Sequence, residues 1–172
     1  AQTQLIEKLV RERGGSLLML AGPMAAPSTY RDNPIGDLLP INIGTGGTFN
    51  PGINVSPEVT EDGQKSLATS LSLAPDVSAR IWSNVKFMSL PQIAGAKSGA
   101  TTLLRLPKAN EVDADYPLVA WHRYGTGKSL FVATEDLWRM RLEVGDRFHG
   151  RFWGQTIQFL TLSRLLGANK QI

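Results

Sequence analysis

Hydrophobic and polar positions follow two different periods along this chain, and the changes of period outline its elements. Apolar residues recur every three or four positions in residues 2–13 and 148–166, which predicts a helix near each end. Residues 117–124 and 128–134 are short runs rich in β-branched and aromatic side chains, which predicts two strands. Because a Gly-Thr-Gly turn separates these strands, we expect them to form a hairpin.

The first helix and the strand after it have the clearest boundaries. One face of this helix carries apolar residues, namely Leu5, Ile6, Leu9 and Val10, and the other carries charged residues. Gly14-Gly15 predicts the C-terminal end of the helix, because glycine readily adopts the conformation that closes one. Residues 16–21 are apolar on both faces, which is typical of a buried strand in a sheet covered by helices.

Short helical turns are expected in the middle of the chain. Residues 33–39 predict one or two turns with Pro34 at the first helical position. Residues 60–63 can cap another turn. Residues 67–73 are compatible with either a helix end or a strand.

The other middle segments are predicted from their composition. The Gly-rich residues 42–52 predict a mobile loop. Residues 53–59 predict an edge strand, because Pro57 is poorly placed for a central one. Further along, we expect an extended segment at 85–91, a strand at 100–106 and a surface loop at 108–116.

The order of these elements is helix, strand, irregular middle, strand, hairpin and helix. This order favours an α/β domain with a mixed sheet and one antiparallel edge. The chain has 172 residues, 42% of them hydrophobic, and can therefore bury one sizeable core. We expect a single domain over residues 1–172.

Composition and charge narrow the range of functions. The formal net charge of +3 is small and the basic residues are scattered, so nucleic acid is not expected as a partner. The chain has no cysteine, which excludes disulfides, thiolate metal sites and a cysteine nucleophile. No apolar run approaches the ~20 residues that span a bilayer. Because the chain opens within a helical pattern and without Met, we expect it to be a piece of a longer protein.

Candidate chemistry gathers in the loop after the second hairpin strand. Glu135, Asp136, Trp138 and Arg139 follow a strand that we expect to be central, and ligands of open α/β sheets bind at the carboxyl ends of strands. A carboxylate pair there could act as a base or bind a metal or a sugar hydroxyl. The alternative is surface charge that a neighbouring arginine neutralises.

The same loop should cover the end of the sheet. We expect Leu137 or Trp138 to fold back over the carboxyl edge of the strands. The guanidinium of Arg139 or Arg141 should pair with a nearby carboxylate, either Glu135, Asp136 or Asp146. Asp146 is also the expected N-cap of the last helix.

Other familiar motifs do not support catalysis. Residues 125–129 read Gly-Thr-Gly-Lys-Ser, but a phosphate-binding loop needs a glycine where this chain has His122, and a helix where we expect a strand. His122 and His149 make no metal-ligand spacing with acidic residues, and no serine lies in a nucleophile-elbow sequence. Phe152 and Trp153 are expected in the core rather than at a cofactor.

Five segments of the chain resemble one known family. They are residues 12–23 (ERGGSLLMLAGP), 57–63 (PEVTEDG), 117–128 (PLVAWHRYGTGK), 133–139 (ATEDLWR) and 149–153 (HGRFW). Together and in this order they resemble the glutamine-amidotransferase-like domains of bacterial, often membrane-anchored, proteins. The resemblance covers most of the chain.

The resemblance implies a fold and a larger context. The fold would be three-layer and flavodoxin-like, the class I glutamine-amidotransferase-like mixed sheet, with a C-terminal β-hairpin and a final helix. Its earliest strands would lie before Ala1. Such domains often stand beside von Willebrand A-type domains and transmembrane helices, so the parent protein is expected to be membrane-anchored.

The resemblance does not extend to glutamine hydrolysis. Active amidotransferases of this fold carry a Cys in the turn after a central strand, activated by a His that an acid orients. In this sequence that turn reads Ala21-Gly22-Pro23, and the position expected for the His reads Glu135-Asp136. Both chemical partners are therefore missing.

Three functional hypotheses follow. The first is a pseudoenzyme that binds a small ligand or a partner protein within a larger envelope-associated bacterial protein, with no cofactor and no metal. Its cleft would be lined by Gly22, Pro23, Glu135, Asp136, Trp138 and Arg139. The second is a hydrolase-type enzyme that uses Glu135 or Asp136 on a small polar or sugar-like substrate. The third is a structural spacer, which predicts no pocket.

Overall fold

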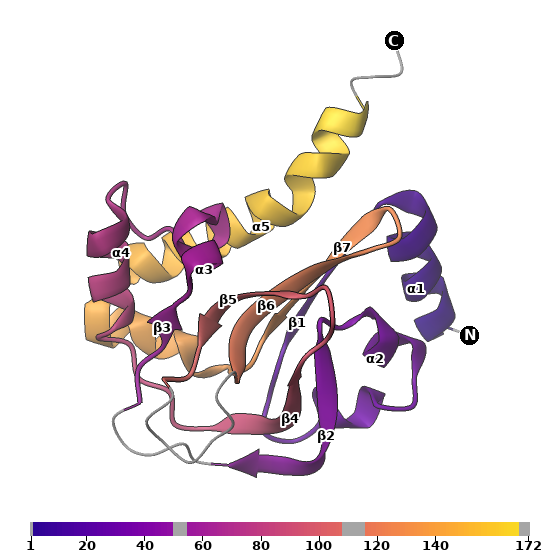
Figure 1. Ribbon diagram of the computed structural model, residues 1–172, viewed down its shortest axis with the longest axis horizontal. Coiled ribbons are helices and arrows are strands. Elements are labelled where there is room, and N and C mark those ends of the chain that lie inside the picture. The colour runs from indigo at the N-terminus through magenta and orange to yellow at the C-terminus, as the bar shows by residue number, and fades with distance from the viewer. Residues whose placement is uncertain (1, 50–54, 108–115, 169–172) are drawn as a thin grey trace.

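A five-stranded mixed sheet forms the centre of the computed structural model, which describes residues 2–49, 55–107 and 116–168. Its strands, in spatial order, are β1 (Ser16–Leu20), β7 (Gly127–Val132), β6 (Pro117–Tyr124), β5 (Thr101–Arg105) and β3 (Glu58–Val59). β1 pairs with β7 in parallel, and the other neighbours pair antiparallel. Strands β2 (Ile41–Phe49) and β4 (Leu90–Ala96) form a separate antiparallel sheet (Figure 1).

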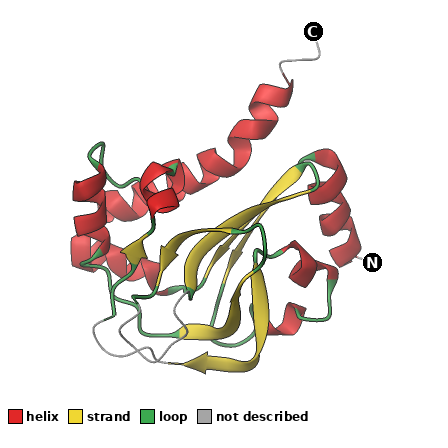
Figure 2. Cartoon of the chain, viewed as in Figure 1, coloured by secondary structure: helices red, strands yellow, loops and turns green. Residues whose placement is uncertain are grey.

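Helices flank this sheet (Figure 2). They are α1 (Gln2–Arg13), α2 (Pro34–Leu38), α3 (Glu61–Lys65), α4 (Pro75–Trp82) and α5 (Asp146–Ala168). Short 3-10 turns cover Ser28–Tyr30, Leu67–Thr69 and Asp136–Arg139, and a π-helical turn at Arg141–Gly145 leads into α5. Among the described residues, no helix combines the length and the apolar character needed to cross a membrane.

Alternation along β6 shows which helices cover which face, because successive residues of a strand point to opposite sides. The Trp121 ring packs edge-on against Phe159 of α5, with centroids 5.0 Å apart. The next residue, His122, donates from Nε2 to Leu38 O at the end of α2, at 2.7 Å. α5 and α2 therefore lie on opposite faces of the sheet.

Most predicted elements of regular periodicity are confirmed. α1 has the predicted bounds, and the β6–β7 hairpin turns at Gly125-Thr126. β1 follows the Gly14-Gly15 stop, but it lies at the edge of the sheet and only its Met19 is buried, so the prediction of a strand buried on both faces is wrong. Gly125 has φ +58°, the left-handed conformation that such a turn requires. α2 begins with Pro34, and Asn33 caps it by accepting from Ile35 N at 3.0 Å.

The middle of the chain differs from its prediction. Residues 42–49, expected as a mobile loop, belong to β2, and residues 50–52 lie outside the described part of the chain. The expected edge strand at 53–59 is confirmed only for β3, and the loop expected at 108–116 falls mostly outside the described residues. Antiparallel pairing is also more extensive than the single edge expected. Helix α4 was not predicted.

The start of α5 corrects a further prediction. Asp146 is not an N-cap, because it already has helical φ and ψ angles of −56° and −36° and continues the π-helical turn. Its carboxylate instead accepts from Arg141 Nε at 2.6 Å. This is one of the arginine–carboxylate pairs that the sequence predicts.

Helix α1 is turned about its axis so that most of its predicted apolar face is exposed. Val10 is only 1% exposed, whereas Leu5 and Leu9 are 67% and 45% exposed. The physical reason is the hairpin turn beneath the helix, where Thr126 N donates to Arg11 O at 2.9 Å. At Gly127 a Cβ atom would collide with the carbonyl oxygens of Val10 and Gly15, so the turn fits the last part of α1 only in this rotation.

Candidate functional site

The carboxyl ends of β1 and β7 meet at one edge of the sheet, because these two strands run in parallel. The segments that follow them therefore lie side by side around a small cavity of about 50 Å³. Its lining consists of Ala21, Gly22, Pro23, Ser89, Pro91, Ala133, Glu135 and Asp136. Four of the six predicted cleft residues are among them: Gly22, Pro23, Glu135 and Asp136.

The carboxylate of Glu135 is the charged group of this cavity that can still accept a hydrogen bond from a ligand. A Cβ atom built on Gly22 would lie 3.7 Å from Glu135 Oε2, so the carboxylate faces the glycine of the opposite turn. The side chain of Glu135 is exposed. Within the described part of the chain it takes part in no hydrogen bond or ion pair, so its oxygens are free to accept from a bound group.

Asp136 is already engaged with the backbone of another segment. Its Oδ2 accepts from Met88 N at 2.9 Å and from Ser89 N at 3.0 Å, and its own N–H donates to Thr134 Oγ1 at 2.9 Å. Asp136 thereby ties the segment before β4 to the end of β7. This tie holds Ser89 at the cavity.

Sequence reasoning did not identify Ser89 and Pro91 as site residues. The segment at 85–91 was expected to be extended, and nothing in it indicates a partner far along the chain. The only available signal was Asp136 itself, since a carboxylate after a strand commonly accepts backbone N–H groups. That signal does not say which N–H groups it reaches.

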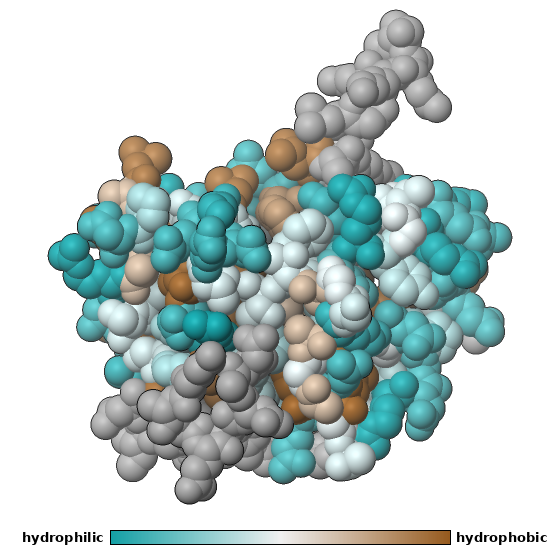
Figure 3. Space-filling model, viewed as in Figure 1, coloured by the Kyte–Doolittle hydropathy of each residue, from teal (hydrophilic) through white to brown (hydrophobic). Residues whose placement is uncertain are grey.

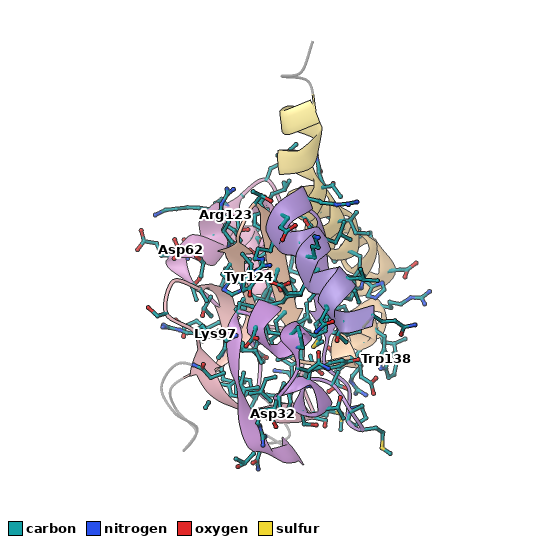
Figure 4. All side chains as sticks on the ribbon, turned by 90° about the vertical axis from the view of Figure 1, so that its right-hand side faces the viewer. Asp32, Asp62, Lys97, Arg123, Tyr124 and Trp138 are labelled. Atoms are coloured by element: carbon teal, nitrogen blue, oxygen red, sulfur yellow. The ribbon has the colours of Figure 1, made fainter. Side chains whose placement is uncertain are left out.

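Trp138 and Arg139 lie apart from the cavity. Trp138 is 51% exposed and stands at the margin of the molecule (Figure 4). Arg139 Cζ lies 5.5 Å from the Trp138 ring, and its Nε lies 3.6 Å from Glu143 Oε1. Leu137 is buried, as expected for the side chain that covers the sheet edge. The structure therefore separates this pair from the other four predicted residues.

The histidines do not belong to the cavity either. His122 lies against α2, and burial lowers its pKa below the ordinary value of 6.5, with Lys97 adding a smaller effect in the same direction. His149 Nε2 accepts from Trp153 Nε1 at 3.0 Å on α5. No described residue at the cavity can thus form a nucleophile and base pair with a histidine.

The size and composition of the cavity limit what it can hold. A volume of about 50 Å³ holds a few water molecules or the tip of a side chain, whereas sites for metabolites usually measure 300 Å³ or more. Among the described residues, no group of three or more His, Cys, Asp or Glu side chains could hold a metal ion. The arrangement can accept a hydrogen-bond donor or a cationic tip at Glu135.

Comparisons with known proteins show the fold alone. No protein-family model matches the chain. No curated protein matches it either.

Among solved structures, the chain is similar to cytoplasmic protein STM3548 from Salmonella typhimurium, with a TM-score of 0.67, 20% identity, and 92% of this chain and 59% of that one covered. It is also similar to cytoplasmic protein STM1381 from Salmonella typhimurium LT2, with a TM-score of 0.64, 17% identity, and 92% and 60% covered. A β-galactosidase from Bacillus circulans sp. alkalophilus matches at a TM-score of 0.48 and 12% identity, over 94% of this chain and 20% of the enzyme. The chain thus spans about three fifths of the length of the first two structures.

Proposed function

We propose that this chain is a non-catalytic, glutamine-amidotransferase-like module of flavodoxin-like type that binds a ligand or a partner protein within a larger, envelope-associated bacterial protein. One observation supports it above the others. The turn after β1, where active members of the family carry their cysteine, faces the free carboxylate of Glu135 across the cavity. That site offers an acceptor for binding and lacks the cysteine nucleophile of the active family members.

The size of the cavity favours a partner protein over a metabolite. A single lysine or arginine tip of a partner fills about 50 Å³ and brings the donors that Glu135 lacks. Ala21 and Ala133 supply an apolar wall for the stem of such a side chain. The rest of the partner would then rest on the surface around the cavity.

The binding test uses N-acetyl-arginine amide and N-acetyl-lysine amide as probes. In an ¹H–¹⁵N NMR titration, we expect shifts at Gly22 and Glu135 with either probe, lost in Glu135→Gln. Glu135→Gln should leave the free energy of unfolding within about 0.5 kcal/mol, as for other exposed positions. The same shifts in the wild type and in Glu135→Gln, or no shifts at all, would contradict the proposal.

Asp136→Ala separates the binding role from a structural one. It leaves two backbone N–H groups without their charged acceptor, so unfolding by urea should show a loss of about 2 kcal/mol. A loss as small as that of Glu135→Gln would show that the tie to Met88 and Ser89 does not hold the cavity together.

The free carboxylate of Glu135 also favours a second function, a hydrolase that uses it as a general base on a small polar or sugar-like substrate. Asp136 is a weaker candidate, because its Oδ2 is occupied by two N–H groups. A panel of nitrophenyl glycosides and esters tests this function, together with ammonia release from glutamine. Turnover that disappears in Glu135→Gln would replace the binding proposal, and we expect none.

A further inference from the structure

A groove runs along the surface between α4 and the beginning of α5, which lie next to each other in Figure 1. It consists of two adjoining lobes of about 630 Å³ and about 270 Å³ that share Val77, Ile81 and Phe148. None of these residues borders the cavity at Glu135. The groove is therefore a separate surface from the proposed site.

Apolar side chains line the groove at helical spacing. Val77 and Ile81 are four positions apart on α4, Leu73 lies two residues before that helix, and Val144 and Phe148 are four apart on the opposite side. Leu73 is 96% exposed and Val77 37% exposed. Figure 3 shows hydrophobic atoms projecting at the upper left, where the chain enters α4. Ile81, Val144 and Phe148 are half-buried, and the Arg147 guanidinium lies 4.5 Å from the Phe148 ring centroid. An exposed apolar edge and a half-buried apolar floor thus form the groove.

The walls of the groove are held in place from inside. Ser78 Oγ accepts from Leu71 N at 2.9 Å and donates to Thr69 O at 3.1 Å, and Trp82 Nε1 donates to the same carbonyl at 2.9 Å. From α5, Arg151 Nε donates to Ser70 O at 3.1 Å. Because the loop before α4 is fixed to both helices, ligand binding would not carry the entropic cost of ordering this loop.

The groove also carries uncompensated positive charge. Arg147 and Arg151 lie four positions apart on one face of α5, where like charges repel each other. Neither forms an ion pair with a carboxylate in the described part of the chain. The nearby Glu143 does not compensate them, because it is engaged with Arg139 at 3.6 Å and accepts from Lys86 N at 3.0 Å.

We propose that this groove is the docking site for an acidic amphipathic helix of a partner protein. Apolar residues at positions i, i+4 and i+7 of that helix would seat against the apolar edge and floor of the groove. Its flanking carboxylates would pair with Arg147 and Arg151, for which bidentate guanidinium geometry is well suited. α4 has eight residues, about 12 Å of helix, so the contact would extend over roughly two turns of the partner.

The test is fluorescence anisotropy with a labelled synthetic peptide that has leucines along one helical face and glutamates beside them. We expect the peptide to bind the wild-type chain. Arg147→Glu/Arg151→Glu should weaken binding at least about tenfold and should make the remaining binding less dependent on salt concentration. Leu73→Ser/Val77→Ser should weaken binding to a similar degree. Circular dichroism and urea midpoints establish that each variant is folded.

Two matched controls make the result specific. Arg13→Glu/Arg123→Glu gives the same change in net charge at exposed positions that line neither lobe of the groove, and should leave binding unchanged. A scrambled peptide of the same composition, whose leucines do not share a face, should not bind.

Several outcomes would overturn the proposal. They are no binding of the peptide, equal loss in the control variant, equal binding of the scrambled peptide, or binding of anionic lipid vesicles in its place. Glu135→Gln should leave peptide binding unchanged, so a failure here leaves the proposed function at the cavity standing.

Discussion

Two neighbouring apolar residues after β7 lie in opposite environments. Leu137 is 1% exposed and covers the carboxyl edge of the sheet, whereas Trp138 is 51% exposed and contacts Arg139 through its ring. Their order in the 3-10 turn decides this division, because consecutive residues of a turn with about three residues per revolution point about 120° apart.

Trp138→Ala should therefore lower the free energy of unfolding by about 1 kcal/mol, the centre of the usual range for point mutants. Urea unfolding measures this directly. A core residue of this size would cost ~3–5 kcal/mol, and a loss in that range would contradict the exposed position.

At the residue scale, His122 makes stability depend on pH. Burial and the nearby Lys97 lower the pKa of His122 in the folded state, so below pH ~6.5 the unfolded chain binds the proton more readily. Stability is then lost as pH falls from 6.5 towards the folded-state pKa, and is fully present above 6.5.

His122→Gln is the variant that checks this, because its amide can still donate to Leu38 O and does not titrate. We expect the difference in unfolding free energy between wild type and variant to be constant above pH 7. Between pH 6.5 and 5, the wild type should lose unfolding free energy relative to the variant. A difference that stays flat over the whole range would show that His122 is not the group responsible.

At the scale of elements, α1 illustrates a local pattern overruled by packing. The helix turns Val10 towards the core and leaves Leu5, Ile6 and Leu9 exposed. Its rotation is set by the β6–β7 turn, whose Thr126 N–H and Oγ1 both donate to Arg11 O, at 2.9 and 3.0 Å.

This rotation predicts opposite results for neighbouring positions of α1. Leu5→Lys should change the free energy of unfolding by no more than about 0.5 kcal/mol, since this side chain is 67% exposed. Val10→Ala should cost roughly 2 kcal/mol through loss of buried methyl groups. Thermal or urea unfolding of the two variants distinguishes them, and the reverse order would mean that the hydrophobic pattern, not the turn, sets the rotation.

At the scale of the whole molecule, aromatic packing joins α4 to α5. The rings of Trp82 and Phe152 are both fully buried and meet edge-on, with centroids 5.5 Å apart at 87°. This contact links an eight-residue helix, too short to be stable alone, to the long helix on the sheet.

A double-mutant cycle measures that link. Phe152→Ala alone should cost ~3–5 kcal/mol, and the coupling with Trp82→Ala should be about 0.5–1.5 kcal/mol beyond the loss of buried area. Additive losses would show that the two helices are held to the sheet independently of each other.

The sequence by itself determined the elements whose signals are local. Periodicity and the Gly14-Gly15 stop predicted the bounds of α1 and the start of β1, and the Gly-Thr-Gly turn predicted the hairpin, because these signals act over a few residues. Four predicted cleft residues lie together because a parallel pair of strands brings the segments after them to one edge.

Only the tertiary structure decided the features that depend on distant partners. The Gly-rich β2 is a strand because β4, some fifty residues away, pairs with it. Asp136 is a structural tie, and Ser89 is a cavity residue, because of hydrogen bonds that cross 47 or more positions of the chain. The rotation of α1 follows from a turn more than a hundred residues later. Hydrophobic pattern records which residues prefer burial, but the geometry of packing decides which of them are buried.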